Sequence, residues 1–435
     1  MMGKTNFSCI LALLSVWLPF VAVMGDDWPQ WRGLNRDGVW HETGIIEKFE
    51  GGQIPILWRA KLAGGYSGPT VPEGRVYVSD HQTEPTEMER ILCFDARTGK
   101  HLWTHSYECS YNIPYPAGPR ASVGIFDGRA YSLGAMGHLT CLNAENGSVL
   151  WQKDLNKEYH IRMPTWGIAA APIVEGDLVI VQIGGRDGAC LVAFDRKTGV
   201  EKWRALDDRC SYSAPILIEQ AGKRVLVCWT GDSVAGLNPQ TGKVYWRHPS
   251  QSPRGVIGVA TPVTDRGALF VTGFYEGSLM LRLAPGRLSV EEVWKRRGPD
   301  EMHTDALHSL IPTPILDGEF IYGIDSYGEL RCLDARTGDR IWESIGVVTP
   351  NVRWGTAHMV RNSDKVWMFN ELGELIMCRL SPKGYQEISR ARLIAPAGHQ
   401  ARRSGGVTWA HPAFADKHVF ARSHTELVCA SLAAR

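Results

Sequence analysis

The chain has 435 residues, with 47 lysines and arginines against 46 aspartates and glutamates, and its formal net charge is +1. Because the basic residues are scattered along the chain, the sequence lacks the basic footprint expected of a nucleic-acid-binding protein. The chain is also longer than the ~250–300 residues at which a single hydrophobic core usually stops growing, so we expect several domains or a repeat that adds cores side by side.

The first 25 residues have the pattern of a secretory signal peptide. An apolar run covers residues 7–24 and ends just before Asp26, and we expect cleavage after Gly25. The alternative is a retained membrane anchor, which Pro19 disfavours because it interrupts the run. No later segment is apolar enough to cross a bilayer. The sequence therefore predicts an exported protein of the periplasm or the extracellular space, without an integral membrane span once the signal is removed.

Tryptophan recurs from Trp58 to Trp342 at intervals of roughly 43–52 residues, which is the range expected of propeller blades. In five of these units a Gly stands four residues before the Trp, and an Asp or Asn stands eight residues before it. The five motifs are Asp95, Gly99 and Trp103; Asn143, Gly147 and Trp151; Asp195, Gly199 and Trp203; Asn238, Gly242 and Trp246; and Asp334, Gly338 and Trp342. A spacing shared by five segments indicates one structural unit repeated along the chain.

The spacing within the motif is that of a hairpin turn. The Asp or Asn side chain can accept hydrogen bonds from nearby backbone N–H groups, and the Gly takes the positive φ that closes such a turn without steric cost. The Trp then falls on the returning strand, where its ring can pack between neighbouring sheets. We therefore interpret the motif as a structural corner, and we expect function on the opposite face.

Each unit contains four short predicted strands, as residues 169–203 illustrate. The second strand of several units is continuously apolar, which indicates that both of its faces are covered. The sequence predicts an all-β, eight-bladed propeller of four-stranded antiparallel blades over residues 56–435. The last unit has only three strands of its own. We expect residues 56–62 to supply its fourth strand, with residues 26–55 as an N-terminal clasp segment that leads into it.

The Asp-x-x-Thr-Gly-x-x-x-Trp corner, together with the opening string DWPQWRG and the following RDG, resembles the pyrroloquinoline-quinone (PQQ) repeat β-propellers. That superfamily includes the quinoprotein alcohol dehydrogenases and non-catalytic, BamB-like scaffolds of the cell envelope. The resemblance covers essentially all of the chain after the predicted signal, and it implies the propeller fold. The shared motif is the structural corner, so the resemblance leaves both an enzyme and a scaffold open.

The cofactor motifs that the resemblance implies for an enzyme do not recur in this sequence. No two cysteines are adjacent, Cys-x-x-Cys-His is absent, and no matching motif places calcium ligands or a catalytic aspartate. We therefore expect a binding or scaffold protein of the cell envelope, and we assign no catalytic residue. The alternative is a PQQ- and calcium-dependent oxidoreductase of alcohols or sugars that acts at the same face.

Chain topology is expected to place most of the histidines and the residues that differ from blade to blade on one face of the ring. The connections between blades and the turns between second and third strands share that face, and most of the 14 histidines fall in them. The candidate binding residues are Arg120, Trp166, His308, Arg353, Trp354, His358, Trp409 and His411. Aromatic, Arg and His side chains suit a small anionic or planar ligand, or an anchor for a protein partner. The alternative is that these residues only pack between blades or face solvent.

Two further features leave alternatives open. The side chains of His303, Asp305, His308, His358 and His411 have the chemistry of metal ligands, but nothing fixes their geometry, so no metal site is predicted. Most cysteines after Cys9 lie at the ends of apolar runs, and we expect buried small apolar side chains. For Cys109 and Cys210, which begin matching Cys-Ser-Tyr strings, the alternative is a disulfide bridge. The protein is expected to be monomeric.

Overall fold

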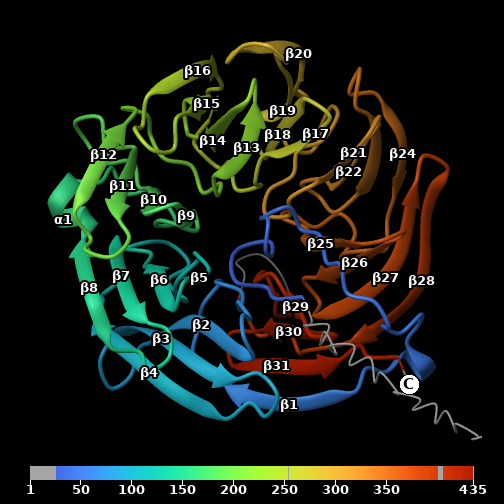
Figure 1. The fold of residues 1–435 in the computed structure, drawn as a ribbon. Helices are drawn as coiled ribbons and strands as arrows, with labels where there is room; N and C mark the ends of the chain where they lie inside the picture. Colours follow the sequence, from blue (N-terminus) through green and yellow to red (C-terminus); the bar gives the residue numbers. More distant parts are fainter. Residues whose placement is uncertain (1–25, 253, 400–404, 435) are drawn as a thin grey trace, which may run out of the picture.

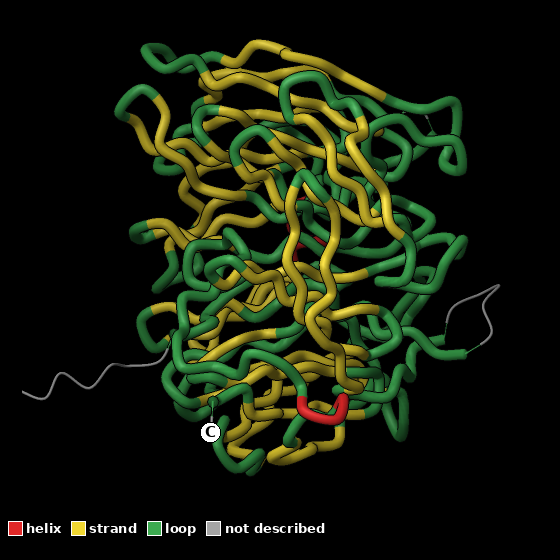
Figure 2. Tube along the Cα trace, turned by 90° about the vertical axis from the view of Figure 1, so that its right-hand side faces the viewer, coloured by secondary structure: helices red, strands yellow, loops and turns green. Residues whose placement is uncertain are grey.

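The computed structural model describes residues 26–252, 254–399 and 405–434, so the predicted signal peptide lies outside the described residues. Eight antiparallel sheets are arranged as blades in a ring (Figure 1). Seen from the side in Figure 2, strands and loops make up almost the whole trace. The predicted eight-bladed, all-β propeller is confirmed.

The blades follow one another along the chain, and each strand pairs with the next. Blade 1 consists of β2 (Arg75–Gln82), β3 (Met88–Asp95) and β4 (His101–Glu108), and blade 2 consists of β5 (Gly124–Phe126), β6 (Arg129–Leu133), β7 (His138–Asn143) and β8 (Val149–Asp154). Blade 3 consists of β9 (Ile173–Glu175), β10 (Leu178–Gln182), β11 (Leu191–Asp195) and β12 (Glu201–Ala205), and blade 4 consists of β13 (Ile216–Gln220), β14 (Lys223–Trp229), β15 (Ser233–Leu237) and β16 (Val244–Pro249). Blade 5 consists of β17 (Val263–Asp265), β18 (Ala268–Gly273), β19 (Gly277–Leu283) and β20 (Val290–Arg296), and blade 6 consists of β21 (Ile315–Asp317), β22 (Phe320–Ile324), β23 (Leu330–Asp334) and β24 (Arg340–Ser344). Blade 7 consists of β25 (Ala357–Asn362), β26 (Lys365–Asn370), β27 (Glu374–Ser381) and β28 (Gly384–Arg392), and blade 8 consists of β29 (Ala413–Ala415), β30 (His418–Arg422), β31 (Glu426–Ser431) and β1 (Ile56–Lys61).

The ring closes in blade 8, where the outermost strand comes from the other end of the chain. Strand β1 pairs antiparallel with β31, and Arg59 lies opposite Val428. This pairing confirms the predicted closure by an N-terminal strand, and it covers an edge that would otherwise be open. Blade 1 has three regular strands, and an isolated bridge between Thr70 and Tyr77 takes the innermost place. The two short helices are η1 (Glu50–Gly52) and α1 (Leu155–Tyr159).

The repeated corner joins each blade to the one before it. In the first copy, the Asp95 carboxylate accepts a hydrogen bond from the Thr98 N–H at 2.8 Å, and Gly99 has φ +71°. The Trp58 indole N–H, which belongs to blade 8, donates to the Ala96 carbonyl at 2.8 Å. A Cβ at Gly99 would lie only 2.6 Å from the Trp58 ring. The Gly is therefore required twice, for its backbone angle and for the close approach of the neighbouring Trp.

The corner glycines of the other four motifs have the same backbone conformation. Their φ angles are +74° at Gly147, +71° at Gly199, +70° at Gly242 and +77° at Gly338. The first three lie against the Trp of the preceding blade as Gly99 does. Gly338 differs in one respect, because the atom nearest to its hypothetical Cβ is the Arg296 Cδ atom at 2.8 Å, and the Trp294 ring follows at 3.1 Å. The longer separation from the ring fits the irregular hairpin that precedes Trp294.

The indole contact also recurs around the ring, as a structural corner between blades requires. The indole N–H groups that donate to a carbonyl in the next blade's corner belong to Trp103 (Ala144), Trp151 (Arg196), Trp203 (Pro239), Trp294 (Ala335) and Trp342 (Ser381). Trp246 is different: it donates to the Gln220 side chain at 2.8 Å. The blade that follows Trp246 lacks the Asp-Gly turn in its sequence, which explains why the Trp246 indole has a different partner.

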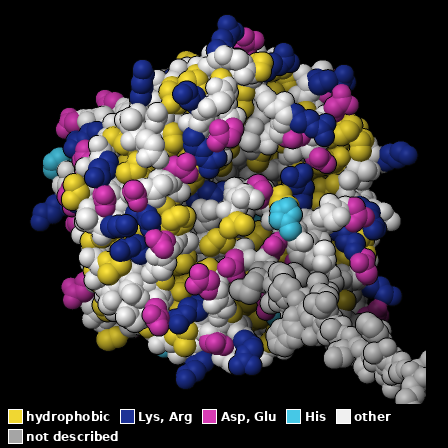
Figure 3. All heavy atoms as spheres, viewed as in Figure 1, with side chains coloured by type: hydrophobic (Ala, Val, Ile, Leu, Met, Phe, Trp, Pro, Cys, Tyr) yellow, Lys and Arg dark blue, Asp and Glu magenta, His cyan; other side chains and the backbone are white. Residues whose placement is uncertain are grey.

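The blades pack through apolar strands that are covered on both faces. Strand β10, with the sequence LVIVQ, is buried along its whole length. All nine described cysteines are buried and free, so the predicted small apolar role is supported and the alternative Cys109–Cys210 bridge is wrong. Charged side chains of both signs are interspersed over the face seen in Figure 3. Within the described part of the chain, no helix is both long enough and apolar enough to span a bilayer.

Candidate binding cavity on the ring axis

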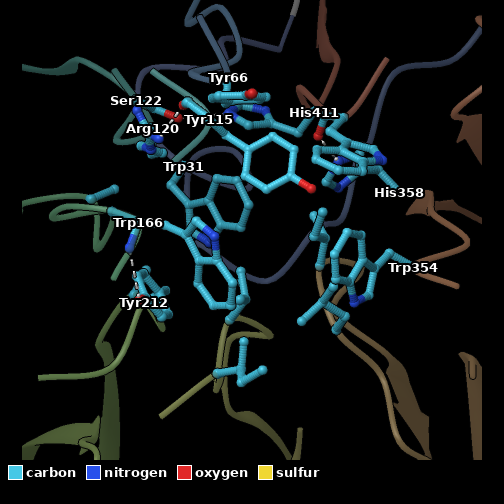
Figure 4. Close-up of a pocket in the computed structure, with 18 residues that line it drawn as sticks. Trp31, Tyr66, Tyr115, Arg120, Ser122, Trp166, Tyr212, Trp354, His358 and His411 are labelled. Atoms are coloured by element: carbon cyan, nitrogen blue, oxygen red, sulfur yellow. Dashed lines mark hydrogen bonds between the residues drawn. The ribbon is translucent and has the colours of Figure 1, made fainter. Parts of the chain in front are cut away.

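A cavity lies on the axis of the ring, and every connection between consecutive blades contributes to its wall (Figure 4). Its volume, including the open mouth, is about 1040 Å³. The lining residues are Trp31, Tyr66, Tyr115, Arg120, Ser122, Trp166, Ala169, Ala171, Tyr212, Ala214, Ile257, Val259, Leu310, Ile311, Trp354, His358, Trp409 and His411. Seven of them are Trp or Tyr, so the wall is mainly aromatic, which is typical of small-molecule sites.

The N-terminal segment supplies part of this wall by entering the centre of the ring. The Trp31 indole N–H donates to the Thr261 hydroxyl at 2.8 Å, which ties the segment to blade 5. The Arg36 guanidinium donates to the carbonyls of Ala171 and Pro172 at 3.1 and 2.9 Å. Residues 26–55 therefore do more than lead into the closing strand β1, because their first part carries an aromatic ring into the cavity.

Arg120 is the cation of the cavity wall. Its guanidinium lies 5.0 Å from the centre of the Tyr66 ring and donates to the backbone carbonyls of Gly118 and, at 2.7 Å, Tyr115. None of the ion pairs found among the described residues involves Arg120. Burial lowers the pKa of this guanidinium and raises the pKa of Tyr66 to about 12, so both retain their usual protonation at neutral pH. The cavity thus presents a partly desolvated positive charge that forms no direct ion pair among the described residues, although the Glu89 carboxylate is near enough to act against the lowering of its pKa; such a charge favours an anion.

Two histidines lie beside each other in the cavity wall, with their ring centres 6.1 Å apart. The His358 Nε2 atom lies 2.8 Å from the Trp409 carbonyl, and the His411 Nδ1 atom lies 3.1 Å from the Pro412 carbonyl. Because carbonyls only accept, these nitrogens carry hydrogens. The remaining His411 nitrogen, Nε2, then accepts from the Ser122 hydroxyl at 2.6 Å.

The histidine environment opposes acid–base catalysis at neutral pH. Burial lowers the pKa of His358 to about 4, and burial together with the nearby His358 lowers the pKa of His411 to about 3. The Ser122–His411 pair resembles a nucleophile and its base in geometry, but an imidazole with so low a pKa is a weak base near pH 7. The pair is better suited to polar contact with a ligand than to acyl transfer.

Acidification should weaken the fold through these two imidazoles. Between pH 7 and pH 5 an unfolded histidine, with a pKa near 6.5, takes up a proton that the folded His358 and His411 do not, so the free energy of unfolding falls as pH falls. Replacing His358 with Gln should reduce this fall by roughly 1–2 kcal/mol. Urea unfolding midpoints at pH 7 and pH 5 measure the effect. The exposed His101→Gln control should behave like the wild type, and equal pH dependence in all three proteins would contradict the expectation.

The structure brings together six of the eight candidate binding residues that the sequence singles out. Those that line the cavity are Arg120, Trp166, Trp354, His358, Trp409 and His411. His308 is buried elsewhere, where its Nδ1 atom lies 3.0 Å from the Phe274 carbonyl. Arg353 lies outside the wall, with its guanidinium 4.8 Å from the Trp354 ring centre and 3.2 Å from the Glu301 carboxylate. The ligand-binding role of the six remains a prediction.

Sequence reasoning missed several aromatic residues of the wall. Tyr66 and Tyr212 each stand three residues before the Pro that opens an innermost strand, which is also the position of the predicted Trp409, and all three line the cavity. Aligning the blades on that Pro would have found the two tyrosines. Trp31 carries no such signal, because it lies outside the repeats. Tyr115 lies in the long connection between blades 1 and 2, where no repeat position applies.

Neither metal hypothesis from the sequence fits the wall of this cavity. His303 contacts Asp300, Asp305 pairs with Arg296, and His308 is buried in its own network, so these residues do not converge on His358 and His411. No Asp, Glu, Asn or Gln is among the described residues that line the cavity. Calcium requires several oxygen ligands of that kind. The donor set therefore does not fit the calcium that a quinone-dependent dehydrogenase of this superfamily would need.

Comparison with known proteins finds a family model and a large set of similar folds. The model described as outer membrane protein assembly factor BamB matches residues 87–344. The outer membrane protein assembly factor BamB of Kangiella koreensis is 25% identical over 131 residues, which is 28% of this chain and 30% of that protein. The match thus spans less than a third of the relative's length.

Solved structures show the same architecture at low sequence identity. BamB from Moraxella catarrhalis superimposes with a TM-score of 0.59 and 14% identity, covering 87% of this chain and 99% of that one. Quinohemoprotein alcohol dehydrogenase from Comamonas testosteroni gives a TM-score of 0.62 and 12% identity, covering 94% of this chain and 81% of that one. At such identities the likeness concerns the fold alone.

Proposed function

Because the chain belongs to the PQQ-like β-propeller family whose model is described as outer membrane protein assembly factor BamB, we propose that it is an exported binding protein of the cell envelope. In this role the propeller is a rigid scaffold, and the cavity on its axis holds a planar aromatic group that carries a carboxylate. Such a group is either a small organic acid or the anchoring part of a larger partner. The proposal adopts from the relative only its place at the cell envelope.

The observation that carries the ligand class is the setting of Arg120. The guanidinium lies in a wall that holds seven aromatic rings, forms no ion pair with a carboxylate among the described residues, and is partly shielded from water. A carboxylate can receive two parallel N–H donors from a guanidinium, and an aromatic ligand ring can stack on Trp or Tyr side chains. The neutral His358 and His411 add polar contacts without adding charge.

An enzyme that oxidises alcohols with PQQ and calcium is less well supported. Among the described residues, the cavity wall offers calcium no carboxylate or amide oxygen from a side chain, and His411 is too weak a base to abstract a proton near neutral pH. The dehydrogenases among the similar structures share 12–14% identity with this chain, which bears on the fold only. We therefore retain binding as the function.

A matched pair of probes tests the proposal. Purified protein would be titrated with 2-naphthoate and with the neutral 2-naphthamide, while the fluorescence of the cavity tryptophans is followed. We expect the acid to bind at least about tenfold more tightly, because only the acid can pair with Arg120. Equal affinity, or no saturable quenching with either probe, would contradict the proposal.

The dehydrogenase alternative is tested in the same preparation. The protein would be incubated with PQQ, with and without calcium, and assayed for bound chromophore and dye-linked alcohol oxidation. Stoichiometric, calcium-dependent binding with turnover would overturn the scaffold proposal. Quinone binding without calcium dependence and without turnover would agree with it, because PQQ is itself a planar aromatic acid. Cell fractionation tests the envelope location.

A further inference from the structure

A second group of polar side chains lies between blades 1 and 2, outside the cavity wall. Glu89 belongs to β3, Cys109 directly follows β4, and His138 begins β7. One ligand atom from each of these residues lies within 4.8 Å of the other two, and the Cys109 Sγ atom is 3.8 Å from the His138 Nδ1 atom. Glu89 and Cys109 are buried, and His138 is only partly buried. The group therefore has one open side.

The surroundings hold the Glu89 carboxylate in a fixed position. The hydroxyl groups of Tyr107 and Tyr111 donate to its two oxygens, and the Ala135 N–H donates to Oε1 at 3.0 Å. A Cβ at Gly134 would lie 2.1 Å from Glu89 Oε2, so the Gly leaves the space that the carboxylate occupies. In metal sites, hydrogen bonds of this kind to a ligating side chain hold it in the orientation that binds the metal. Three donors leave one further lone-pair direction available on Oε2.

The backbone around Cys109 is fixed in the same way. The His81 Nε2 atom lies 3.2 Å from the Cys109 carbonyl and 3.3 Å from the Glu87 carboxylate, and the His81 ring stacks on Tyr111 at 4.1 Å. The Cys109 N–H donates to the Glu87 carbonyl at 3.1 Å. The thiol is therefore presented toward His138 by a backbone that is anchored on both sides.

We propose that Glu89, Cys109 and His138 form a binding site for a divalent transition metal ion, with Zn²⁺ as the expected ion. Thiolate, imidazole and carboxylate are the three ligand types that Zn²⁺ takes in proteins, and three protein ligands leave a fourth position for water. Mixed sulfur and nitrogen ligands disfavour Mg²⁺ and Ca²⁺, which require oxygen. Binding converts the Cys109 thiol into a zinc-bound thiolate and releases its proton to solvent, so the reaction balances without a further reactant.

The chain contains its own matched control in the connection between blades 3 and 4. Cys210 is buried and begins the same Cys-Ser-Tyr string as Cys109. Among the residues that the structure describes, the Glu89–Cys109–His138 trio is the group whose metal-binding atoms converge, and Cys210 is not part of it. A metal that recognises the trio must distinguish between the two cysteines, whereas non-specific thiol binding would not.

The test uses the full chain without a histidine tag, stripped with a chelator and titrated with Zn²⁺ by calorimetry and with Co²⁺ by absorption spectroscopy. We expect one ion per chain, proton release on binding, and a thiolate-to-cobalt charge-transfer band. The Cys210→Ser variant should match the wild type. The Cys109→Ser variant should lose the band and bind Zn²⁺ at least about tenfold more weakly.

A second variant keeps the proposal testable if Cys109→Ser does not fold. His138 is partly exposed, and His138→Gln should fold while binding Zn²⁺ at least about tenfold more weakly. Retention of the cobalt band at higher Co²⁺ concentration in this variant would support the thiolate as a separate ligand. The proposal is overturned if the wild type binds less than one ion with micromolar affinity, or if Cys109→Ser and Cys210→Ser behave alike.

Discussion

Replacing Gly147 with alanine is expected to lower the free energy of unfolding by about 2–5 kcal/mol. Gly147 has φ +74°, and a non-glycine residue in this region loses about 1–2 kcal/mol. The added Cβ would also lie 2.5 Å from the Trp103 ring of the preceding blade, and relieving such overpacking adds about 1–3 kcal/mol. Urea unfolding, followed by tryptophan fluorescence and circular dichroism, measures the loss.

Gly128 in the same blade separates the two contributions. It has φ +67°, but no atom lies within 4 Å of the position that its Cβ would take. Gly128→Ala should therefore lose only the backbone part, about 1–2 kcal/mol. Equal losses in the two variants would mean that contact between the corner and the neighbouring Trp contributes little to the stability of the ring.

Replacing Arg120 with methionine is expected to weaken the binding of 2-naphthoate by about 10–150-fold. A hydrogen bond to a charged group contributes about 1.5–3 kcal/mol, and about 1.4 kcal/mol corresponds to a factor of ten. Methionine keeps much of the side-chain volume, so the aromatic wall should persist. Affinity for 2-naphthamide should change little, because the amide does not depend on the positive charge.

Arg353→Met is the matched control. Both arginines lie in connections between blades, and the sequence gives them the same expectation, but only Arg120 lines the cavity. The Arg353 guanidinium pairs with Glu301 and lies against the Trp354 ring. Its replacement should change the affinity for 2-naphthoate by less than about threefold, since a surface ion pair contributes little. A loss as large as that of Arg120→Met would mean that the carboxylate is bound elsewhere.

The fold could be predicted because its contacts are repeated. The spacing of Asp95, Gly99 and Trp103 returns in four other units, and each copy provides the same turn. This motif predicted the architecture, while the spacing of the tryptophans and the three-stranded last unit predicted the number of blades and the closing strand. Even its absence before Trp294 had a structural counterpart, because Trp246 binds Gln220 in place of a corner carbonyl.

The site could be predicted only in part because its residues are not repeated. His308 and His358 both stand in or beside connections between blades, yet one is buried against Phe274 and the other lines the cavity. The difference depends on the length and path of each connection, which a single sequence does not define. Trp31 was missed because its position follows from contacts with Thr261, which lies 230 residues away. The proximity of Glu89, Cys109 and His138 likewise depends on how two blades face each other.

The long-range contacts of the N-terminal segment have a consequence for how the molecule is made. Trp31 and Arg36 are synthesised early, but the residues that they contact stand just before the first strands of blade 5 and blade 3, respectively. Strand β1 cannot pair until β31 has been synthesised. Strand β1 therefore reaches its final place only after the last strand is made, although it lies near the start of the chain. Trp31 and His411 stand in the same wall, so the cavity is complete only in a ring whose two ends have met.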